Sequence, residues 1–457
     1  MPLPLASRYV SLLNFLLTLP IVGACPLSSP LGLISINMAE PIHIDGTTLE
    51  GGGQLLRFSL CLSSLTRIPT HITKIRANRG KPGVPGGLKQ AHLVAAEWLA
   101  KASRASTQGM HLKSSDLDFR PATGGDGSRK SSVWDDVYEN GKLVRRESSI
   151  KMTSPGSILL VLQAVLPYIL FSPPVTSTSQ NLIADPPVPI HLSITGGTNV
   201  WHSLSYEYAA QVLFPILSTK LGLPPINMTM HARGYSAGRT AEIGKVTFVI
   251  QPLSLGQKLP AFIMTDRGDV CKITVTILAG SDRQRVDTKT EVERQLQARF
   301  SDVELEFNAE EDTQDPRRWY LLLVAETANG FRLGRDWIYD QKIDTVHPHK
   351  TARKLVTRVV NDLAAELAHG GCVDEYLQDQ LVIFQALANG RSIIDGREAS
   401  LHTKTVQWLA ERLLDVKFVD DKCEGIGFVA GRGEWTGPSS VGEIVSGVER
   451  LQLKKVD

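Results

Sequence analysis

The alternation of short strand-like segments with helical segments between Met38 and Val419 constrains the fold of this chain more than any other feature. Pro41 to Asp45 and His191 to Thr195 read as strands, whereas Ser157 to Phe171 and Leu401 to Leu414 have helical apolar spacing. These units recur without a strict short-period repeat, which hints at duplicated modules. The alternation predicts an α+β protein in which helices cover sheets.

The composition is that of an ordinary globular protein with two or three domains. The chain has 457 residues, of which 42% are hydrophobic and 21% charged, and this excludes a disordered chain, a collagen and a coiled coil. The net charge is only +2, so any anion site must be local. Five cysteines without a CxxC pair argue against a zinc site and a disulfide scaffold, and fit a reducing compartment.

The first 38 residues are a separate question. The apolar segment Tyr9 to Cys25 follows Arg8 and ends in small residues, as a signal peptide does, but Pro20 interrupts it and it is short for a membrane span. The alternative is an upstream extension of the reading frame, with Met38 as the start. We expect an N-terminal extension or targeting segment over residues 1–38, no membrane span after residue 38, and a nuclear or cytoplasmic protein rather than a secreted one.

A change of sequence character near Asp266 divides the remaining chain. Strands and two helices from there to about Gly370 predict an inserted α+β domain over residues 265–370. The larger domain would then comprise residues 39–264 and 371–457. The stretch from Ala122 to Ser149 is polar and rich in Gly, Ser and charge, which predicts a mobile insertion.

Three glycines between Glu50 and Gln54 form the first candidate binding motif. Glycine lets a backbone approach a phosphate closely, and Gln54 opens a helix whose free N–H groups suit an anion. Arg57 follows one turn later and can point back at that anion. No Gly-Lys-Ser/Thr follows, so this is not a Walker A loop, and a tight strand–helix turn would also explain the glycines.

Basic side chains gather in the loop that follows the next predicted strand, His71 to Arg76. Arg76, Arg79 and Lys81 form a small cluster, and arginine is suited to bidentate phosphate contacts. Gln90 and His92 could join this cluster. The alternative is a solvated loop, which is what most charge runs are.

Three helices carry further candidate side chains. Tyr376, Asp379 and Gln380 project from one helix face, where a ring, a carboxylate and an amide could bind a base. His402 opens another helix and could be a nucleophile or an acid/base. Gln163 lies in an apolar helix and needs a partner, which could be a ligand or backbone. Each of these residues alone would equally suit a structural role.

Taken together and in this order, the motifs resemble the RNA 3'-terminal phosphate cyclase family. The resemblance covers Ile44 to about Phe418, and six ordered motifs are far more specific than any one of them. The motifs are IDG…EGGGQLLR, IRANRGKPG, PGS…VLQAVLP, ITGGTN, VDEYLQDQL and the His402 region.

The resemblance implies a fold and a ligase-class reaction. The fold would be a large domain of three repeated βαβ-type modules with a smaller inserted α+β domain. A histidine would attack ATP and form a covalent histidine–AMP, and AMP would pass to an RNA 3'-phosphate to give RNA–(3')pp(5')A. The adjacent 2'-hydroxyl would then close a 2',3'-cyclic phosphate. ATP, Mg²⁺ and an RNA with a 3'-phosphate end would be the partners, in RNA processing or repair.

The resemblance also implies roles for individual residues. His402 matches the nucleophile. The positions that match ATP-binding residues are Gln163, Tyr376, Leu377, Gln378, Asp379 and Gln380. The positions that match phosphate- or RNA-binding residues are Glu50, Gln54, Arg57, Arg76, Arg79 and Gln90. Glu50 is also a candidate metal ligand.

Four departures from the family pattern stand out. The turn after Arg233 lacks a glycine run, the Gln-His pair becomes Gln90-Ala91-His92, Leu204 stands where a proline would cover the adenine, and the insertion at 122–149 is long. The main alternative function is a non-catalytic cyclase-like factor in ribosome assembly, against which His402 and Glu50 argue. An enolpyruvyl-type transferase and a plain RNA-binding module are further alternatives, but 6% aromatic residues give no RNA-binding surface.

Overall fold

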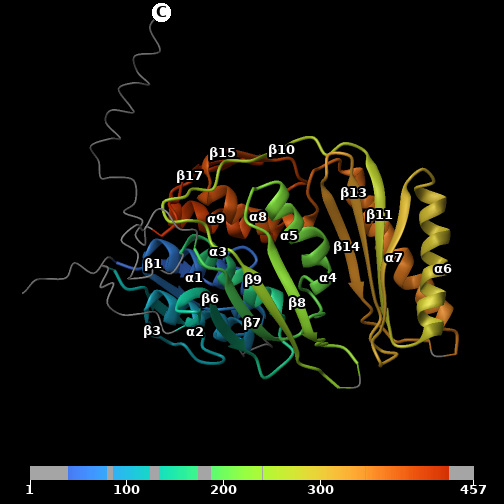
Figure 1. Ribbon diagram of the computed structural model, residues 1–457, viewed down its shortest axis with the longest axis horizontal. Helices are drawn as coiled ribbons and strands as arrows, with labels where there is room; N and C mark the ends of the chain where they lie inside the picture. Colours follow the sequence, from blue (N-terminus) through green and yellow to red (C-terminus); the bar gives the residue numbers. More distant parts are fainter. Residues whose placement is uncertain are drawn as a thin grey trace, which may run out of the picture. The chain divides into compact units, whose positions relative to one another are not determined.

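The computed structural model describes residues 40–79, 86–123, 133–172, 187–238, 240–344 and 346–431 (Figure 1). The chain divides into two compact units, Met1–Met38 and Ala39–Asp457, and every described residue belongs to the second. The predictions for residues 1–38 and for Lys81 therefore lie outside the described residues. No helix in the described ranges is both long and apolar enough to cross a membrane.

The first sheet combines a parallel strand–helix–strand unit with antiparallel neighbours. Its strand order is β1-β2-β4-β3, and β1 and β2 are the parallel pair. Two helices, α1 and α2, pack against each other beside this sheet. The elements are β1 (Ile42–Asp45), α1 (Gly53–Thr66), β2 (Thr70–Thr73), α2 (Gln90–Ser103), β3 (Ser106–Gln108) and β4 (Leu117–Arg120).

Strand β2 is shorter than predicted. The sequence favoured a strand up to Arg76, but Lys74 and Arg76 have φ angles of 50° and 54°, which are left-handed and end an extended strand. A single 3₁₀ turn, η1 (Ala77–Arg79), follows. This change of direction carries Arg76 and Arg79 away from the sheet and towards the glycine turn that precedes α1.

A five-stranded sheet of order β5-β6-β7-β9-β8 follows in the chain. Strands β6 and β7 pair in parallel, and the apolar helix α3 connects them. A continuous helical stretch from α4 through a π-helical segment, η2, to α5 then leads to β8. The elements are β5 (Asp135–Glu139), β6 (Lys142–Lys151), α3 (Ile158–Phe171), β7 (Ile190–Gly196), α4 (Tyr206–Tyr208), η2 (Ala209–Leu213), α5 (Phe214–Thr219), β8 (Ile226–Ala232) and β9 (Gly244–Ile250).

The prediction of a mobile insertion at 122–149 is wrong for its second half. Strands β5 and β6 form an antiparallel hairpin there, and β6 joins the sheet. Arg146 is buried and pairs with Asp136, while Ser148 accepts a hydrogen bond from the indole of Trp98. The sequence did not predict strand β6 because two of its buried side chains, Arg146 and Ser148, are polar. Residues 124–132 lie outside the described residues.

The segment between residues 265 and 370 has a sheet of its own, of order β12-β11-β13-β14. Its helices, α6 and α7, pack against each other and against this sheet. Helix α6 is one of the two helices predicted in this segment. It begins directly after Ser281, whose side chain accepts from the backbone N–H of Gln284. The elements are β11 (Val270–Ala279), α6 (Asp282–Arg299), β12 (Glu304–Asp312), β13 (Tyr320–Thr327), β14 (Arg332–Ile338) and α7 (Pro348–Ala368).

The last sheet joins residues from both sides of that segment. Its order is β10-β15-β17-β16, and β10, which precedes residue 265, pairs in parallel with β15, which follows residue 370. The elements are β10 (Ile263–Met264), α8 (Glu375–Leu387), β15 (Asn389–Ile394), α9 (Leu401–Leu414), β16 (Phe418–Val419) and β17 (Lys422–Ile426). The mixed α+β class is thus confirmed, whereas the division into an inserted domain and three repeated modules stays a prediction.

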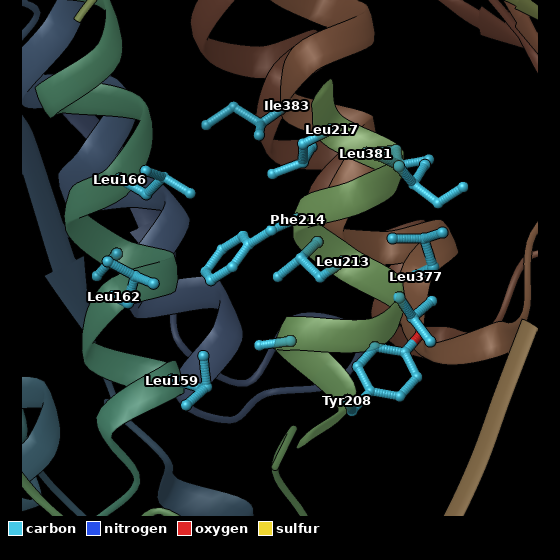
Figure 2. Packing of buried hydrophobic residues seen from close by; sticks show 14 of the residues in the cluster. Leu159, Leu162, Leu166, Tyr208, Leu213, Phe214, Leu217, Leu377, Leu381 and Ile383 are labelled. Carbon is cyan, nitrogen blue, oxygen red and sulfur yellow. The ribbon is translucent and has the colours of Figure 1, made fainter. Parts of the chain in front are cut away.

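Helices from three of these groups share one hydrophobic core. Figure 2 shows leucines of α3 facing leucines and Phe214 of the η2–α5 stretch, with apolar side chains of α8 alongside. Leu162, Leu217 and Leu381 are each at most 1% exposed. Burying one such side chain contributes roughly 1.5–3 kcal/mol, so this packing fixes how α3 and α8 lie relative to each other. Helix α1 packs against both α3 and α9, which places four helix ends around one cavity.

Candidate active site

A cavity of about 360 Å³ lies where α1, α3, α8 and α9 meet the 200–204 loop and strand β14. Its size is in the range of small-molecule sites, roughly 300–1,000 Å³. Seven of the predicted site residues line it, and they are Gln54, Arg57, Gln163, Tyr376, Asp379, Gln380 and His402. They come from segments more than 300 residues apart in the chain, so the fold alone assembles them.

A chain of hydrogen bonds joins four of these side chains. His402 Nδ1 lies 2.5 Å from the amide oxygen of Gln54, whose amide nitrogen donates to Asp379 Oδ2 at 2.7 Å. The second oxygen of Asp379 accepts from the side chain of Gln380 at 2.5 Å. The Asp379 carboxyl is buried, which raises its pKa to about 6 although both amides and the nearby His402 and Arg57 act in the opposite direction.

Capping interactions fix where His402 stands. The side chain of Ser400 accepts a hydrogen bond from the backbone N–H of Thr403 at 3.1 Å, so α9 begins directly before the histidine. One turn later, the hydroxyl of Thr405 accepts from the backbone N–H of Glu50 at 3.1 Å. This hydrogen bond joins the first turn of α9 to the glycine turn before α1, in addition to the Gln54–His402 contact.

The glycine turn is explained by close approach. A Cβ atom on Gly53 would lie 2.3 Å from Nε2 of His92 and 2.8 Å from a guanidinium nitrogen of Arg57. Such distances leave no room for a side chain, so glycine lets both groups reach the backbone at the start of α1. The structure thus gives the glycine run a packing role that holds with or without a bound phosphate.

Arg57 links the cavity to the basic cluster. Its Nε donates to the side-chain oxygen of Gln163 at 2.6 Å, so the partner that Gln163 needed is this guanidinium. Burial lowers the pKa of Arg57 to about 10, while Glu50 and Asp379 oppose that shift. Arg57 therefore remains a cation at neutral pH, buried beside the cavity.

Glu50, Arg76, Arg79 and His92 surround the glycine turn. Arg79 forms an ion pair with Glu50 at 2.8 Å, and Gly52 N–H donates to the same carboxylate at 2.7 Å. Among the described residues, Nε of Arg76 and Nδ1 of His92 are buried without a hydrogen-bond partner. Burial, reinforced by neighbouring cations, lowers the pKa of His92 well below its ordinary value, so this ring is neutral.

A protein-family model described as RNA 3'-terminal phosphate cyclase matches residues 48–419 of this chain. The chain belongs to this family. A probable RNA 3'-terminal phosphate cyclase of Dictyostelium discoideum is 30% identical over 378 residues, which are 81% of this chain and 76% of that protein. RNA 3'-terminal phosphate cyclases of Methanosarcina barkeri and Drosophila melanogaster are 29% and 28% identical, covering 84% and 82% of this chain and 98% and 92% of theirs.

Six predicted site residues of this cyclase-family member do not line the cavity. Glu50, Arg76 and Arg79 lie at the glycine turn, and the other three lie elsewhere. Leu377 is fully buried in the core, and Gln378 turns to the other side of α8, where it donates to the carbonyl of Arg397 at 3.0 Å. Helical geometry separates them from Tyr376 and Gln380 on the neighbouring face. Gln90 binds the hydroxyls of Thr153 and Ser154 at the surface.

The sequence reasoning missed the side of the cavity that the 265–370 segment supplies. Asp336 and Trp337 of β14 and Arg358 of α7 line it, as does Trp201 in the loop after β7. Burial raises the pKa of the Asp336 carboxyl to about 6, and Tyr320 donates to it at 2.9 Å. Strand periodicity does not reveal which end of a strand lies at a cavity, so only the exposed Trp201 beside the GGTN motif offered a signal.

Leu204, the one departure from the family pattern that touches the cavity, also lines its wall. On α8, the ring of Tyr376 is stacked by the guanidinium of Arg335 at 4.6 Å and contacts the ring of Tyr208. Burial raises the pKa of the Tyr376 hydroxyl to about 12, so it stays protonated. The cavity therefore offers the ring of Tyr376, held by its neighbours, and the aliphatic side chain of Leu204, besides the rings of Trp201 and Trp337.

Proposed function

We propose that this chain is an ATP-dependent enzyme that converts an RNA 3'-terminal phosphate into a 2',3'-cyclic phosphate through a covalent adenylate on His402. One observation carries the proposal: a histidine at a helix start faces a cavity of nucleotide size and, among the residues that the structure describes, has a hydrogen-bonded neighbour on one ring nitrogen only. Membership of the cyclase family supports the reaction class.

The nucleoside of ATP would occupy the cavity. Tyr376 and Leu204 offer an aromatic and an aliphatic surface for the flat faces of a base. Asp379, Gln380 and Gln163 bring a carboxylate and two amides to the same space, which suits ribose hydroxyls and base edges. These contacts would hold the α-phosphorus next to His402.

The first step exchanges one bond for another. Nε2 of His402 attacks the α-phosphorus of ATP, a nitrogen–phosphorus bond forms, and the bond to pyrophosphate breaks. The proton on Nδ1 stays in place, so the adenylated ring is a cation and a good leaving group. Arg57, a buried cation beside the cavity, would stabilise the charge that develops on the phosphate oxygens.

The basic cluster would hold the remaining phosphates. Arg76 brings a buried Nε without a protein partner among the described residues, which suits an anionic ligand. Arg57 and Arg79 add two further guanidinium groups nearby, whereas Gln90 would need to leave its present partners to join them. Mg²⁺ would suit the Glu50 carboxylate, because this ion is commonly held by one or two carboxylates together with substrate phosphates. The described residues contain no cluster of three or more His, Cys, Asp or Glu side chains that could hold a metal without the nucleotide.

Two further steps complete the reaction. An oxygen of the RNA 3'-phosphate attacks the adenylate phosphorus, which releases His402 and gives RNA–(3')pp(5')A. The 2'-hydroxyl then attacks the 3'-phosphorus, loses its proton and expels AMP. The anionic 3'-phosphate lacks a leaving group until it is adenylated, and the adjacent hydroxyl gains from proximity.

An RNA oligonucleotide with a 3'-phosphate tests the proposal. With ATP and Mg²⁺, the wild-type protein should render the end resistant to phosphomonoesterase, and His402→Asn should not. His111→Asn, which changes an exposed histidine, is the matched control. A 2'-deoxy terminal nucleotide should stop the reaction at RNA–(3')pp(5')A. A folded wild-type protein that leaves the end unchanged would contradict the proposal and favour a non-catalytic, ribosome-assembly type of relative.

A further inference from the structure

The amide of Gln54 lies between two groups that constrain its orientation. Its nitrogen lies 2.7 Å from Asp379 Oδ2, and its oxygen lies 2.5 Å from Nδ1 of His402. Gln54 is only 3% exposed, so water does not compete strongly for either contact. Among the described residues, this is the one hydrogen bond that the His402 ring makes.

The direction of each hydrogen bond follows from the donors and acceptors available. An ionised carboxylate can only accept, so the NH₂ group of Gln54 must face Asp379. The second oxygen of Asp379 already accepts from Gln380, which fixes the carboxylate plane. The amide oxygen of Gln54 must then face His402, and because an amide oxygen can only accept, Nδ1 of His402 must carry the proton.

We infer that Gln54, oriented by Asp379, is a positioning residue that selects the Nδ1–H tautomer of His402 and leaves the lone pair of Nε2 free. This role differs from the phosphate contact expected for Gln54 from the sequence. The inference rests on the proposed function in one respect: the proposed function makes the free Nε2 the nucleophile. Gln54 and Asp379, which are 325 residues apart in the chain, would thus together set the tautomer of His402.

The chemistry of the adenylate adds a second effect. When Nε2 binds phosphorus, the ring becomes a cation whose remaining proton is on Nδ1. The side-chain oxygen of Gln54 accepts a hydrogen bond from Nδ1–H of this cationic ring. Charge-assisted hydrogen bonds of this kind are stronger than neutral ones. An unconstrained neutral histidine favours the opposite tautomer, with the proton on Nε2. Loss of Gln54 therefore removes both the correct tautomer and the stabilisation of the product.

The tautomer can be observed directly. Protein labelled with ¹⁵N-histidine should show His402, identified by comparison with His402→Asn, with a protonated Nδ1 and a bare Nε2. Gln54→Met should shift the ring towards the Nε2–H form. Gln385→Met is the matched control, because Gln385 is buried in the same helix as Asp379 and donates to the Asp421 carbonyl on the far side. That variant should leave the His402 signals unchanged.

Kinetics give a second, independent readout. Gln54→Met should slow the formation of the adenylate by about 100-fold, the upper end of the range for removing a group that orients a metal-bound histidine, and should change the KM for ATP by less than about threefold. Gln385→Met should react at the wild-type rate. A loss confined to KM would show that Gln54 contacts substrate instead, and would overturn the inference.

A reversal of the donor and acceptor provides the sharpest test. Asp379→Asn alone should slow adenylation, because an amide can donate to Gln54 and turn its NH₂ group towards His402. Adding Gln54→Glu restores an oxygen facing His402 and lets the residue-379 amide donate to the other oxygen, so the double variant should be faster than Asp379→Asn. No recovery in the double variant, or a wild-type His402 with its proton on Nε2, would contradict the inference.

The two proposals fail in different ways. A wild-type protein that forms no adenylate would contradict the proposed function. The ¹⁵N spectra of the wild type and of Gln54→Met would still show which tautomer His402 adopts. Normal adenylation in Gln54→Met with an unchanged spectrum would overturn the positioning role and leave the proposed function intact.

Discussion

Burial shifts the pKa of two ionisable side chains that line the same cavity as His402. The pKa of Arg57 falls to about 10 and that of Asp379 rises to about 6, in both cases because desolvation disfavours the charged form. At neutral pH both side chains are still charged. Arg57 therefore remains a cation beside the cavity, and Asp379 remains a pure hydrogen-bond acceptor for Gln54.

This assignment predicts how adenylation depends on pH. The ordinary pKa of an aspartate is 3.8, so a folded-state value of about 6 means that Asp379 takes up its proton well before an exposed carboxyl would. A protonated Asp379 can donate to Gln54 and reverse the amide. The adenylation rate should therefore fall as pH drops through about 6. Facing Asp379 are Gln54, Gln380, His402 and Arg57.

Asp379→Asn removes the contribution of this carboxyl to the pH profile. Its slower adenylation should decline less steeply on the acid side than that of the wild type, because residue 379 no longer takes up a proton. Initial rates of adenylate formation between pH 5 and 8 measure both profiles. Identical slopes in the two proteins would mean that the Asp379 carboxyl takes no part in the reaction.

At the scale of elements, Asp374 holds the start of α8 to its surroundings. One carboxylate oxygen accepts from the backbone N–H groups of Tyr376 and Leu377 at 3.0 and 2.9 Å and from the hydroxyl of Tyr208 at 2.6 Å. The other oxygen accepts from the backbone N–H of Gly334 in β14 at 2.7 Å. This cap therefore sets the position of the face that carries Tyr376 and Asp379.

Replacing Asp374 should cost both stability and nucleotide affinity. Asp374→Ala removes a helix cap worth about 1 kcal/mol and leaves the buried Tyr208 hydroxyl and the Gly334 N–H without their acceptor, at about 1–3 kcal/mol each. We expect a loss of about 3 kcal/mol or more in the free energy of unfolding and a higher KM for ATP. Urea denaturation and adenylation kinetics test this, with Glu97→Ala, which changes an exposed carboxylate on α2, as a control that should change neither.

Much of this element-scale arrangement could be predicted from the sequence. The spacing of Tyr376, Asp379 and Gln380 places them on one face of α8, and all three line the cavity. Leu377 and Gln378 could have been excluded by the same helical geometry. The β5–β6 hairpin could not be predicted, because Arg146 and Ser148 face inward with polar partners and break the expected alternation. The surroundings of Arg76 could not be predicted either, because they depend on the left-handed backbone of Lys74 and Arg76, which the sequence does not indicate.

At the scale of the whole molecule, one arginine connects three parts of the chain. Arg233, after β8, pairs with buried Glu207 of α4 and with Glu311 of β12, each at 2.5 Å. Glu207 also accepts from Asn199 at 2.7 Å, at the start of the loop that carries Leu204 to the cavity. The sequence showed Arg233 as part of a turn that departs from the family pattern, but it could not show that the side chain reaches the 265–370 segment.

The two partners of Arg233 predict unequal effects. Arg233→Met leaves Glu207 buried without its cation and should destabilise the fold by about 3–5 kcal/mol. Glu311→Gln changes a half-exposed partner and should cost about 1 kcal/mol or less. Thermal unfolding of the two variants compares them directly. Equal losses of stability in the two variants would show that Arg233 stabilises the fold through its contact with Glu311 of β12 and not through its pairing with the buried Glu207.

The central claim is that His402 becomes covalently adenylated, and labelling with ATP that carries a radioactive α-phosphate tests it most directly. Purified protein, ATP and Mg²⁺ are incubated without RNA, and wild type is compared with His402→Asn. We predict an acid-labile, base-stable label on the wild type and none on the variant, as a histidine phosphoramidate requires. A folded wild-type protein without label, or equal labelling of both proteins, would contradict the claim.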